Sequence, residues 1–453
     1  MHFTPPNSRV NEKFRAYFVL SLIFLYVLFT ERIFLQMSSG GRGILPILEL
    51  LVPVIATLIL VFERRTHSLI VLSNNQFLSR FGLYIFLTLL LPFLGVFFND
   101  YPARTSLTSL AGFRAIAFVS FGCWIAQSSQ STQELAKKYL FAAIVIQGLF
   151  ASSQYLYSHG IISGGIFDAQ YKWDITTQSR YSEDYIITGR STGTFINPNE
   201  LGFWSAVAFW SSALALRRWM SVLGCLFALC GLFFSQSRGS LFAITISLII
   251  WTSYTFLSNQ RFLNKAKHFS FVGLIVLLMG LTLGGLIFQD KISNSAILSR
   301  FGNGIKVLSS GASADANAQG RVMAWNLALH FFQKHPEGTW GEPQMRLGSF
   351  MDNDYIRILL QGSVVYLSSF ILLLLSAFLC LKKNSNTGQL LAMISVVLSV
   401  NAMSANPLAY TASAIFWMIS GLHFTQSLKN SSPRERVAAP QLSWQLLSRP
   451  YNA

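Results

Sequence analysis

Apolar runs of about 20 residues recur along almost the whole chain, and they constrain its fold more than any other feature. A run of that length is what an α-helix needs to cross the hydrocarbon core of a bilayer. Only 11% of the 453 residues are charged, whereas soluble domains carry about 25%. We therefore predict an all-α, polytopic integral membrane protein that forms a single domain over residues 1–453.

Hydropathy predicts twelve membrane-spanning helices. Lysine and arginine gather in the tails and short loops of one side, which predicts that both termini face the cytoplasm. The net charge of +16 then reflects topology and attraction to anionic lipid headgroups rather than nucleic-acid binding. The predicted spans lie near residues 16–30, 43–62, 81–98, 107–126, 139–157, 199–216, 219–235, 239–257, 269–288, 364–381, 388–405 and 408–426.

Two long connections fall on the outer side of this topology, residues 158–198 and residues 289–353. The second lies between the ninth and tenth spans. It contains a small-residue run at 309–320, which predicts a flexible tether, followed by a helical pattern over residues 321–334. The polar, proline-punctuated tail at 427–453 is predicted to be cytoplasmic and disordered.

The stretch GRSTGTFINPNELGFW, residues 189–204, predicts the start of the sixth span. Asn197 suits the N-cap, Pro198 the first helical position, and Glu200 the third position of a capping box. This interpretation accounts for those three residues without any function. It leaves Arg190 and the glycine-containing turn after it unexplained.

Three arginines map to the outer face of the predicted topology. Arg190 precedes the sixth span, Arg238 lies in the tight SQSRGS connection between the seventh and eighth spans, and Arg321 lies in the large outer loop. A lone arginine at such a depth is usually an anchor that reaches lipid phosphates. Three arginines beside helix N-termini, whose unpaired N–H groups also attract anions, suit a diphosphate.

The tenth span opens with MDNDYIRILLQG at residues 351–362. Asp352 or Asn353 is a predicted N-cap, and Asp354 with Arg357 is a predicted i, i+3 ion pair. Asp352 is the residue that these structural interpretations explain least well, because it lies close to the arginine-bearing loop. It is therefore a candidate for chemistry.

Other polar residues have structural interpretations. Arg114 lies inside the fourth predicted span, where an ionisable residue is a functional candidate by default, although Glu49 in the second span is a possible ion-pair partner. Three histidines map to the outer loops and are expected to be solvated, and four cysteines lie in apolar runs without metal-binding spacing. These residues are His159, His330, His335, Cys123, Cys225, Cys230 and Cys380.

Four stretches, taken together and in this order, resemble the O-antigen ligase and O-antigen polymerase superfamily of bacterial envelope glycosyltransferases. GTFINPN is similar to that family's Gly-Thr-Phe-x-Asn-Pro-Asn turn, and SQSRGS to its Ser-x-Ser-Arg-Gly turn. RVMAWNLALHFFQKHPEGTWG is similar to its Arg-x3-Trp segment, which continues into Pro-x-Gly-x-Gly. DNDYIRILLQGSVVYL is similar to its closing His-Asn-x-Tyr helix.

The resemblance implies a glycosyltransferase C-like enzyme that moves a glycan from a polyprenyl-diphosphate carrier to an acceptor. The reaction would take place on the periplasmic face of the bacterial inner membrane. The acceptor would be a growing O-antigen or other surface polysaccharide, lipid A-core, or a protein. By the same resemblance, Arg190, Arg238 and Arg321, with Asn197 and Asn199, would bind the diphosphate, and neither a metal nor a cofactor is expected.

The chain departs from the ligase pattern at its closing motif. Where the ligases carry His-Asn, this chain has Asp352 and Asn353, and a shifted register that pairs Met351 and Asp352 with the motif offers no histidine either. A carboxylate can act as general base on an acceptor hydroxyl, so Asp352 is the first candidate base and Asp354 the second. Ligase, polymerase and protein-glycan ligase therefore all remain open.

The alternative from another class is a twelve-helix transporter or a flippase for a lipid-linked glycan. Such transporters commonly build a midplane site between related halves. Here the polar residues concentrate in two unequal outer loops, residues 158–198 and 289–353. This distribution favours chemistry at one membrane face.

Overall fold

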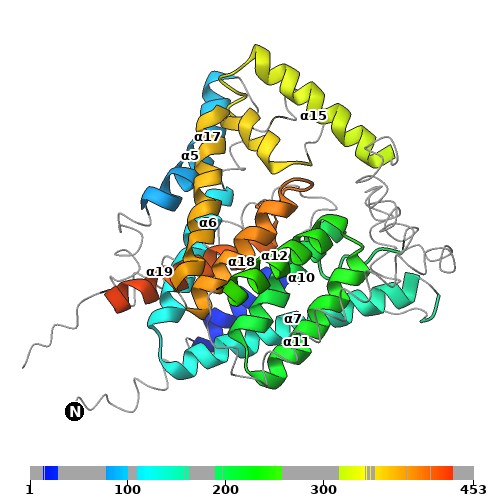
Figure 1. Cartoon of the computed structure of the whole chain (residues 1–453), viewed down its shortest axis with the longest axis vertical. Helices are drawn as coiled ribbons and strands as arrows, with labels where there is room; N and C mark the ends of the chain where they lie inside the picture. The colour runs from blue at the N-terminus through cyan, green and yellow to red at the C-terminus, as the bar shows by residue number, and fades with distance from the viewer. Residues whose placement is uncertain are drawn as a thin grey trace, which may run out of the picture.

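The computed structural model describes the larger part of the chain, and Figure 1 shows how its helices are arranged. Every regular element in the described part is a helix. This agrees with the predicted all-α fold class. The described residues are 14, 16–28, 78–99, 110–158, 160–162, 189–195, 197–257, 316–341, 343, 347, 352–383, 385–408 and 410–431.

Several described helices match the predicted spans closely, but the helices Gln130–Ser158 and Asp354–Phe378 begin well before the predicted spans near residues 139–157 and 364–381. The predicted spans near residues 43–62 and 269–288, and most of the tail at 427–453, lie outside the described residues. In chain order the elements are Ala16–Leu28, η1 (Leu78–Gly82), α5 (Leu83–Phe98), α6 (Leu110–Gln127), α7 (Gln130–Ser158), α10 (Pro198–Ala215), α11 (Arg218–Ser235), α12 (Arg238–Leu257), α15 (Ala316–Lys334), α17 (Asp354–Phe378), η4 (Leu379–Lys383), α18 (Asn386–Asn401), η5 (Thr411–Ser413) and α19 (Ala414–Ser431).

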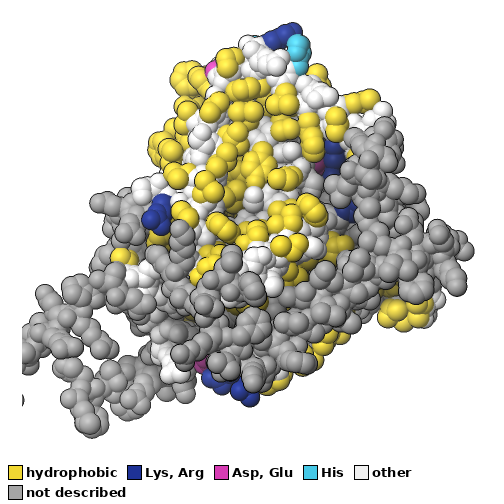
Figure 2. All heavy atoms as spheres, in the orientation of Figure 1, with side chains coloured by type: hydrophobic (Ala, Val, Ile, Leu, Met, Phe, Trp, Pro, Cys, Tyr) yellow, Lys and Arg dark blue, Asp and Glu magenta, His cyan; other side chains and the backbone are white. Residues whose placement is uncertain are grey.

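Four helical stretches in the described part are long and apolar enough to cross a membrane. On the face shown in Figure 2 most described side chains are hydrophobic, and charged side chains lie mainly towards its margins. These properties are those of a membrane protein, while the twelve spans and their orientation stay predictions. The four stretches are Ser79–Phe98, Gln130–Ser158, Arg218–Ser235 and Asp354–Leu381.

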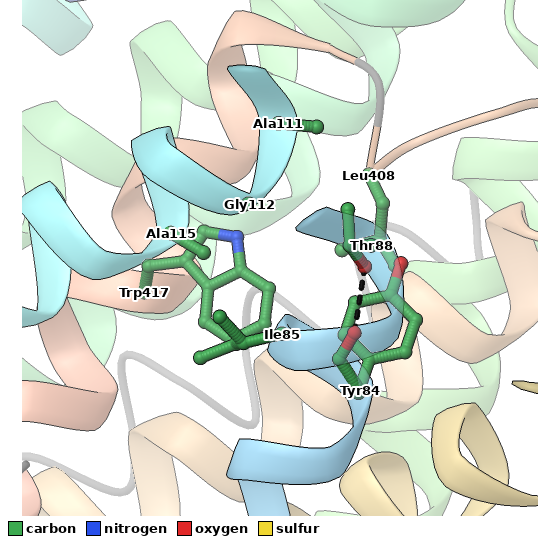
Figure 3. A pocket seen from close by; sticks show the side chains of 8 residues that line it. All are labelled: Tyr84, Ile85, Thr88, Ala111, Gly112, Ala115, Leu408 and Trp417. Atoms are coloured by element: carbon green, nitrogen blue, oxygen red, sulfur yellow. Dashed lines mark hydrogen bonds between the residues drawn. The ribbon is translucent and has the colours of Figure 1, made fainter. Parts of the chain in front are cut away.

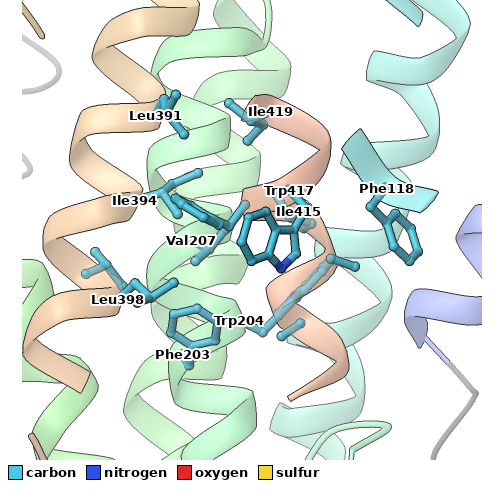
Figure 4. Close-up of a cluster of buried hydrophobic side chains, with 14 of the residues drawn as sticks. Phe118, Phe203, Trp204, Val207, Leu391, Ile394, Leu398, Ile415, Trp417 and Ile419 are labelled. Carbon is cyan, nitrogen blue, oxygen red and sulfur yellow. The ribbon is translucent and has the colours of Figure 1, made fainter. Parts of the chain in front are cut away.

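Helix α10 forms the centre of the bundle. It packs against α11, α12 and α18, and nearly all of its side chains from Pro198 to Ser212 are buried. Aromatic and aliphatic side chains of α10, α18 and α19 interdigitate in this core, as Figure 4 shows. The labelled members from these helices are Phe203, Trp204, Val207, Leu391, Ile394, Leu398, Ile415, Trp417 and Ile419.

Small residues bring two helix pairs into close contact. Between α10 and α11, Gly224 lies against Ser212, and Gly231 lies against Ser205. Between α6 and α19, a Cβ atom at Gly421 would overlap the carbonyl oxygen of Val119. Such small-residue contacts are how helices associate in lipid, where no hydrophobic driving force acts between them.

Helix α17 is bent. Gly362 and Ser363 have non-helical dihedral angles, and Ser363 has a φ of 62°. The bend separates a short first part, which begins at Asp354, from a longer second part (Figure 1). Because a bend frees backbone groups from their helical partners, another segment has to pair with them.

Helix α15 and the region of α18 and α19 also differ from their predictions. Helix α15 begins at Ala316, so part of the run at 309–320, predicted as a flexible tether, is helical. The prediction of a tether rested on the small size of these residues. Alanine and glutamine, however, have high helix propensity. The predicted spans at 388–405 and 408–426 are also shifted, because residues 402–413 lie between α18 and α19. Those residues are mostly apolar, and hydropathy does not distinguish them from helix.

We expect Gly421→Ala to destabilise the protein by about 1–3 kcal/mol, because the added Cβ meets rigid backbone of α6 rather than a movable side chain. Thermal unfolding in detergent measures this effect. The matched control is Gly320→Ala in α15, where nothing lies within 4 Å of an added Cβ. The control should retain or slightly raise Tm, and equal Tm values for both variants would contradict the close α6–α19 packing.

Candidate functional site

Residues 402–413 connect α18 to α19 and bind the starts of two other helices. We call this segment the α18–α19 connector. Ala402 O accepts a hydrogen bond from Asp354 N at 2.8 Å, and Leu408 N donates to Asp354 Oδ2 at 3.5 Å. Ala412 N donates to Glu200 Oε1 at 3.3 Å. The starts of α17 and α10 therefore lie at the same end of the bundle.

The start of α12 joins the same end. Ser240 Oγ donates to Asn401 Oδ1 at 2.8 Å, and Asn401 is the last residue of α18. Gly239 lies against the side chain of Ser404 in the connector, so closely that a Cβ would touch it. Arg238, which opens α12, is half-buried beside these contacts. Its position next to the connector follows from the packing of α12 on α18.

Arg190 links the end of α11 to the start of α10. Its Nε donates to Ser235 O at 3.1 Å, and its Nη2 donates to Asn199 Oδ1 at 3.0 Å. The side chain of Arg190 is buried, with 8% of its surface exposed. These two bonds fix the guanidinium at the end of the bundle that also carries Arg238.

The predicted start of α10 is confirmed at its first two positions. Asn197 is the N-cap, its side chain accepts from Asn199 N at 2.8 Å, and Pro198 is the first helical residue. Glu200 does more than the predicted capping box requires, because its buried carboxylate reaches the connector at Ala412. The side-chain oxygens of Asn197 and Asn199 are both engaged within the protein. Their amide groups support the helix start and Arg190.

Three neighbouring polar residues at the start of α17 have different structural roles. Asn353 is the N-cap, since its side chain accepts from Tyr355 N at 3.0 Å and Ile356 N at 3.2 Å. The predicted ion pair of Asp354 with Arg357 is present, at 2.7 Å. The carboxylate of Asp354 has no exposed surface, which favours its structural interpretation over a role as base. Asp352 is needed for neither the cap nor this pair.

Asp352 forms an ion pair with Arg321. Arg321 Nη2 lies 3.3 Å from Asp352 Oδ2, and the two side chains are 36% and 39% exposed. Arg321 lies in α15, which ends at Lys334, and Asp352 lies just before α17. The pair therefore connects two helices that are not adjacent in the sequence. The structure thus brings together two residues that the sequence singled out separately, at a place that an external molecule can reach.

Partial burial raises the pKa of the Asp352 carboxyl above its ordinary value, and the neighbouring Arg321 opposes part of that rise. The carboxylate therefore has a higher proton affinity than an ordinary aspartate. A raised pKa brings a carboxylate closer to the range in which general bases operate. The proton affinity of Asp352 also depends on where the guanidinium of Arg321 lies.

Residues 335–341 dock into the bend of α17, and we call them the docking loop. Leu360 O, near the bend, accepts from Thr339 N at 2.6 Å and from Thr339 Oγ1 at 3.1 Å. Ser363 Oγ donates to Pro336 O at 2.6 Å. Gly338 has a φ of 84°, and a Cβ there would lie 2.7 Å from Leu360 O. The docking loop thus supplies hydrogen-bond partners for polar groups at the bend. Gly338 lets the loop come this close, because a side chain there would collide with Leu360 O.

The docking loop also holds α15 in place. Asn99 Nδ2, after α5, donates to Thr339 O at 2.8 Å, and the ring of Trp340 packs edge-on against Phe98. Ala328 of α15 packs on Leu360 of α17, and both are fully buried. Figure 1 shows α15 lying across the end of α17. This arrangement positions Arg321 beside Asp352.

A small hollow lies between α5, α6 and α19, next to the connector. Its lining is mostly apolar and contains none of the candidate charged residues, as Figure 3 shows. The lining does not suit a diphosphate, so the connector end of the bundle remains the better candidate site. The lining residues are Tyr84, Ile85, Thr88, Ala111, Gly112, Ala115, Leu408 and Trp417.

The remaining sequence candidates are not among the residues that form the contacts above, or lie outside the described residues. Arg114 is buried in α6 with 5% of its surface exposed, and its suggested partner Glu49 is not among the described residues, nor is His159. His330 is exposed, and His335 pairs with Glu337 at 3.2 Å. In the part of the chain that the structure describes, no three His, Cys, Asp or Glu residues group as a metal site.

Sequence patterns did not predict the α18–α19 connector, the Ser240–Asn401 hydrogen bond or the contact of Thr339 with α17. The only signal for the connector is the Asn-Pro pair at residues 406–407, which interrupts an apolar stretch. Neither Ser240 nor Thr339 has a local pattern that points to its partner, because both partners are distant in the sequence.

Residues 223–362 match the family model described as O-antigen ligase. The matched range contains Arg238, Arg321, Asp352 and the docking loop, whereas Arg190 precedes it. No curated protein matches the chain.

We expect Thr339→Val to loosen α15 from α17, because valine keeps the shape of threonine but loses the hydroxyl, whose proton is shared between Gly341 O and Leu360 O. The cost is about 1 kcal/mol, the size of one neutral hydrogen bond, and hydrogen exchange of the α15 backbone should rise. Thr245→Val, which removes an exposed hydroxyl bond within α12, is the control. Unchanged exchange in α15 would show that the docking loop does not hold this helix.

Proposed function

Because residues 223–362 place this chain in the O-antigen ligase/polymerase superfamily, we propose that it transfers a glycan from a polyprenyl-diphosphate carrier to an acceptor hydroxyl or amide. The reaction takes place at the end of the bundle where α10, α12 and α17 begin. In the proposed topology this end faces the periplasm, and the protein resides in the bacterial inner membrane.

The observation that carries this proposal is the ion pair of Arg321 with Asp352. Both residues lie within the matched range, and both are accessible. The pair places a cation suited to phosphate oxygens next to a carboxylate whose pKa is raised by burial. A glycan transfer from a diphosphate needs these two functions, a charge stabiliser for the leaving group and a base for the acceptor.

The leaving group is the polyprenyl diphosphate. As the bond between the anomeric carbon and the phosphate oxygen breaks, that oxygen keeps the electron pair and negative charge develops on the diphosphate. Arg321, Arg238 and Arg190 neutralise this charge, assisted by the helix starts around them. Asn197 and Asn199 act mainly through Arg190 and the start of α10, because their oxygens are already engaged there.

The acceptor attacks the anomeric carbon through its oxygen or nitrogen lone pair, and Asp352 accepts the proton that this group loses. In the free protein Arg321 lowers the pKa of Asp352. When the guanidinium of Arg321 turns to the diphosphate, that lowering is lost and Asp352 becomes a stronger base. Substrate binding and base activation are thereby coupled through a single arginine.

The substrate is a carrier-linked glycan extracted from cells that lack this protein. The purified protein should transfer that glycan to one of three acceptors. These are a second carrier-linked glycan, lipid A-core, and a protein. Arg321→Ala and Arg238→Ala should each lower the rate by about 100- to 1,000-fold, the size measured when one preorganised donor is removed. The transferred glycan is measured by gel or mass spectrometry.

The control for the arginine variants is Arg217→Ala. Arg217 is 68% exposed and pairs with Glu134 beside the start of α11, at the end of that helix remote from Ser235. Its variant should keep the wild-type rate, because exposed ion pairs contribute little. Full transfer by both site variants would remove the arginine mechanism. Glycan movement across proteoliposomes without covalent transfer would favour the flippase alternative.

The transfer rate should fall as pH falls through the pKa of Asp352, because only the deprotonated carboxylate accepts a proton. Since burial raises this pKa, the fall should begin at a higher pH than for an ordinary aspartate. Arg321→Gln removes the group that lowers the pKa, so the acidic limb of the residual activity should move to still higher pH. Arg321→Lys, which keeps the charge, should move it less.

The pH dependence of kcat/KM measures this effect. Asp352→Asn should lose the acidic limb together with most of the activity. An identical limb in the wild type and in Arg321→Gln would exclude Asp352 as the base.

A further inference from the structure

Asn406 lies in the middle of the α18–α19 connector. Two residues before it, Ser404 contacts Gly239 at the start of α12, and two residues after it, Leu408 donates to Asp354 at the start of α17. Consecutive Cα atoms are about 3.8 Å apart, so Asn406 lies within about 8 Å of both contacts along the backbone. It is therefore located between the helix that begins with Arg238 and the helix preceded by Asp352.

The side-chain oxygen of Asn406 is buried and has no hydrogen-bond partner among the residues that the structure describes. The whole residue is 8% exposed. Buried polar groups in native proteins are nearly always paired, so an orphan acceptor needs an explanation. Its free energy cost is recovered when a ligand supplies the missing donor.

Local backbone structure does not explain this carboxamide. An asparagine that begins a turn commonly accepts from the backbone N–H two residues further on. For Asn406 that donor is Leu408 N, which points instead to Asp354 Oδ2 at 3.5 Å. The usual local partner is therefore directed to another residue, and the oxygen of Asn406 is left for a group from outside.

The chemistry of an amide oxygen limits what that group is. Phosphate oxygens only accept hydrogen bonds at neutral pH, so they do not pair with another acceptor. A sugar hydroxyl donates, and it is neutral, as is the carboxamide. The orphan oxygen thus fits the glycan part of a carrier-linked substrate, while the arginines fit its diphosphate.

We propose that Asn406 binds a hydroxyl group of the carrier-linked glycan and orients its anomeric carbon between Arg238 and Asp352. This inference rests on the proposed function. It adds a contact to the sugar, provided by the α18–α19 connector, which lies outside the residues that match the family model.

The test compares two ligands in nanodiscs, bare polyprenyl diphosphate and the carrier-linked glycan extracted from cells that lack the protein. The wild type should bind the glycan-bearing carrier more tightly. In Asn406→Leu this preference should fall by about five- to tenfold, the size of one neutral hydrogen bond, with unchanged affinity for the bare carrier. Asn406→Ala should have the same effect if the leucine does not fit.

A measurement of Tm distinguishes a residue that contacts substrate from one that stabilises the fold. Asn406→Leu removes an unpaired buried polar atom, so its Tm should equal or exceed that of the wild type. Ser211→Ala is the matched control, because Ser211 Oγ is also buried without a partner among the described residues. Ser211 lies about 20 Å along α10 from its start, so its variant should keep the ligand preference.

Each result has a clear meaning. If the wild type prefers the glycan-bearing carrier and both Asn406 variants keep that preference, this inference is wrong and the proposed function stands. If the wild type binds both carriers equally, no sugar contact exists and the inference also fails. If it binds neither carrier, the proposed function itself is wrong.

Discussion

Backbone groups at helix ends have no partners within their own helix, and in an apolar bundle water does not replace them. This requirement determines how the end of the bundle with α10, α12 and α17 is built. Asparagines cap α10 and α17, and the α18–α19 connector pairs with Asp354 and Glu200. Satisfying these groups brings helix starts from distant parts of the chain together, and the candidate site lies where they meet.

The bend in α17 creates the same requirement within a helix. A straight helix would pair Leu360 O internally, whereas here Thr339 of the docking loop supplies two donors to it. The pairing gives α15 a fixed place on α17, although α15 itself presents many polar side chains. Arg321 is thus positioned by the contact of Thr339, which lies well after it in the sequence, rather than by the residues beside it. A broken helix is tolerated in a membrane protein because such partners are available.

Two aspartate–arginine pairs lie almost next to each other and differ in environment. Asp354 with Arg357 is enclosed, with exposed fractions of 0% and 13%, and it ties the start of α17 to the connector. Asp352 with Arg321 is open, with exposed fractions of 39% and 36%. Breaking an enclosed pair leaves an uncompensated buried charge, whereas an open pair separates at small cost. The open pair is the one that can exchange its partner for a substrate.

Sequence patterns alone predict the fold class, most helix positions, the start of α10 at Asn197 and Pro198, and the candidates Arg238, Arg321 and Asp352. These features depend on hydropathy, capping and motif order, which are local along the chain. The folded structure was needed to show that Asp352 pairs with Arg321 while Asp354 is enclosed, that Thr339 pairs with the bend of α17, and that the connector carries Asn406 between two helix starts. These outcomes depend on contacts between residues far apart in sequence, and no local pattern of hydropathy or spacing specifies them.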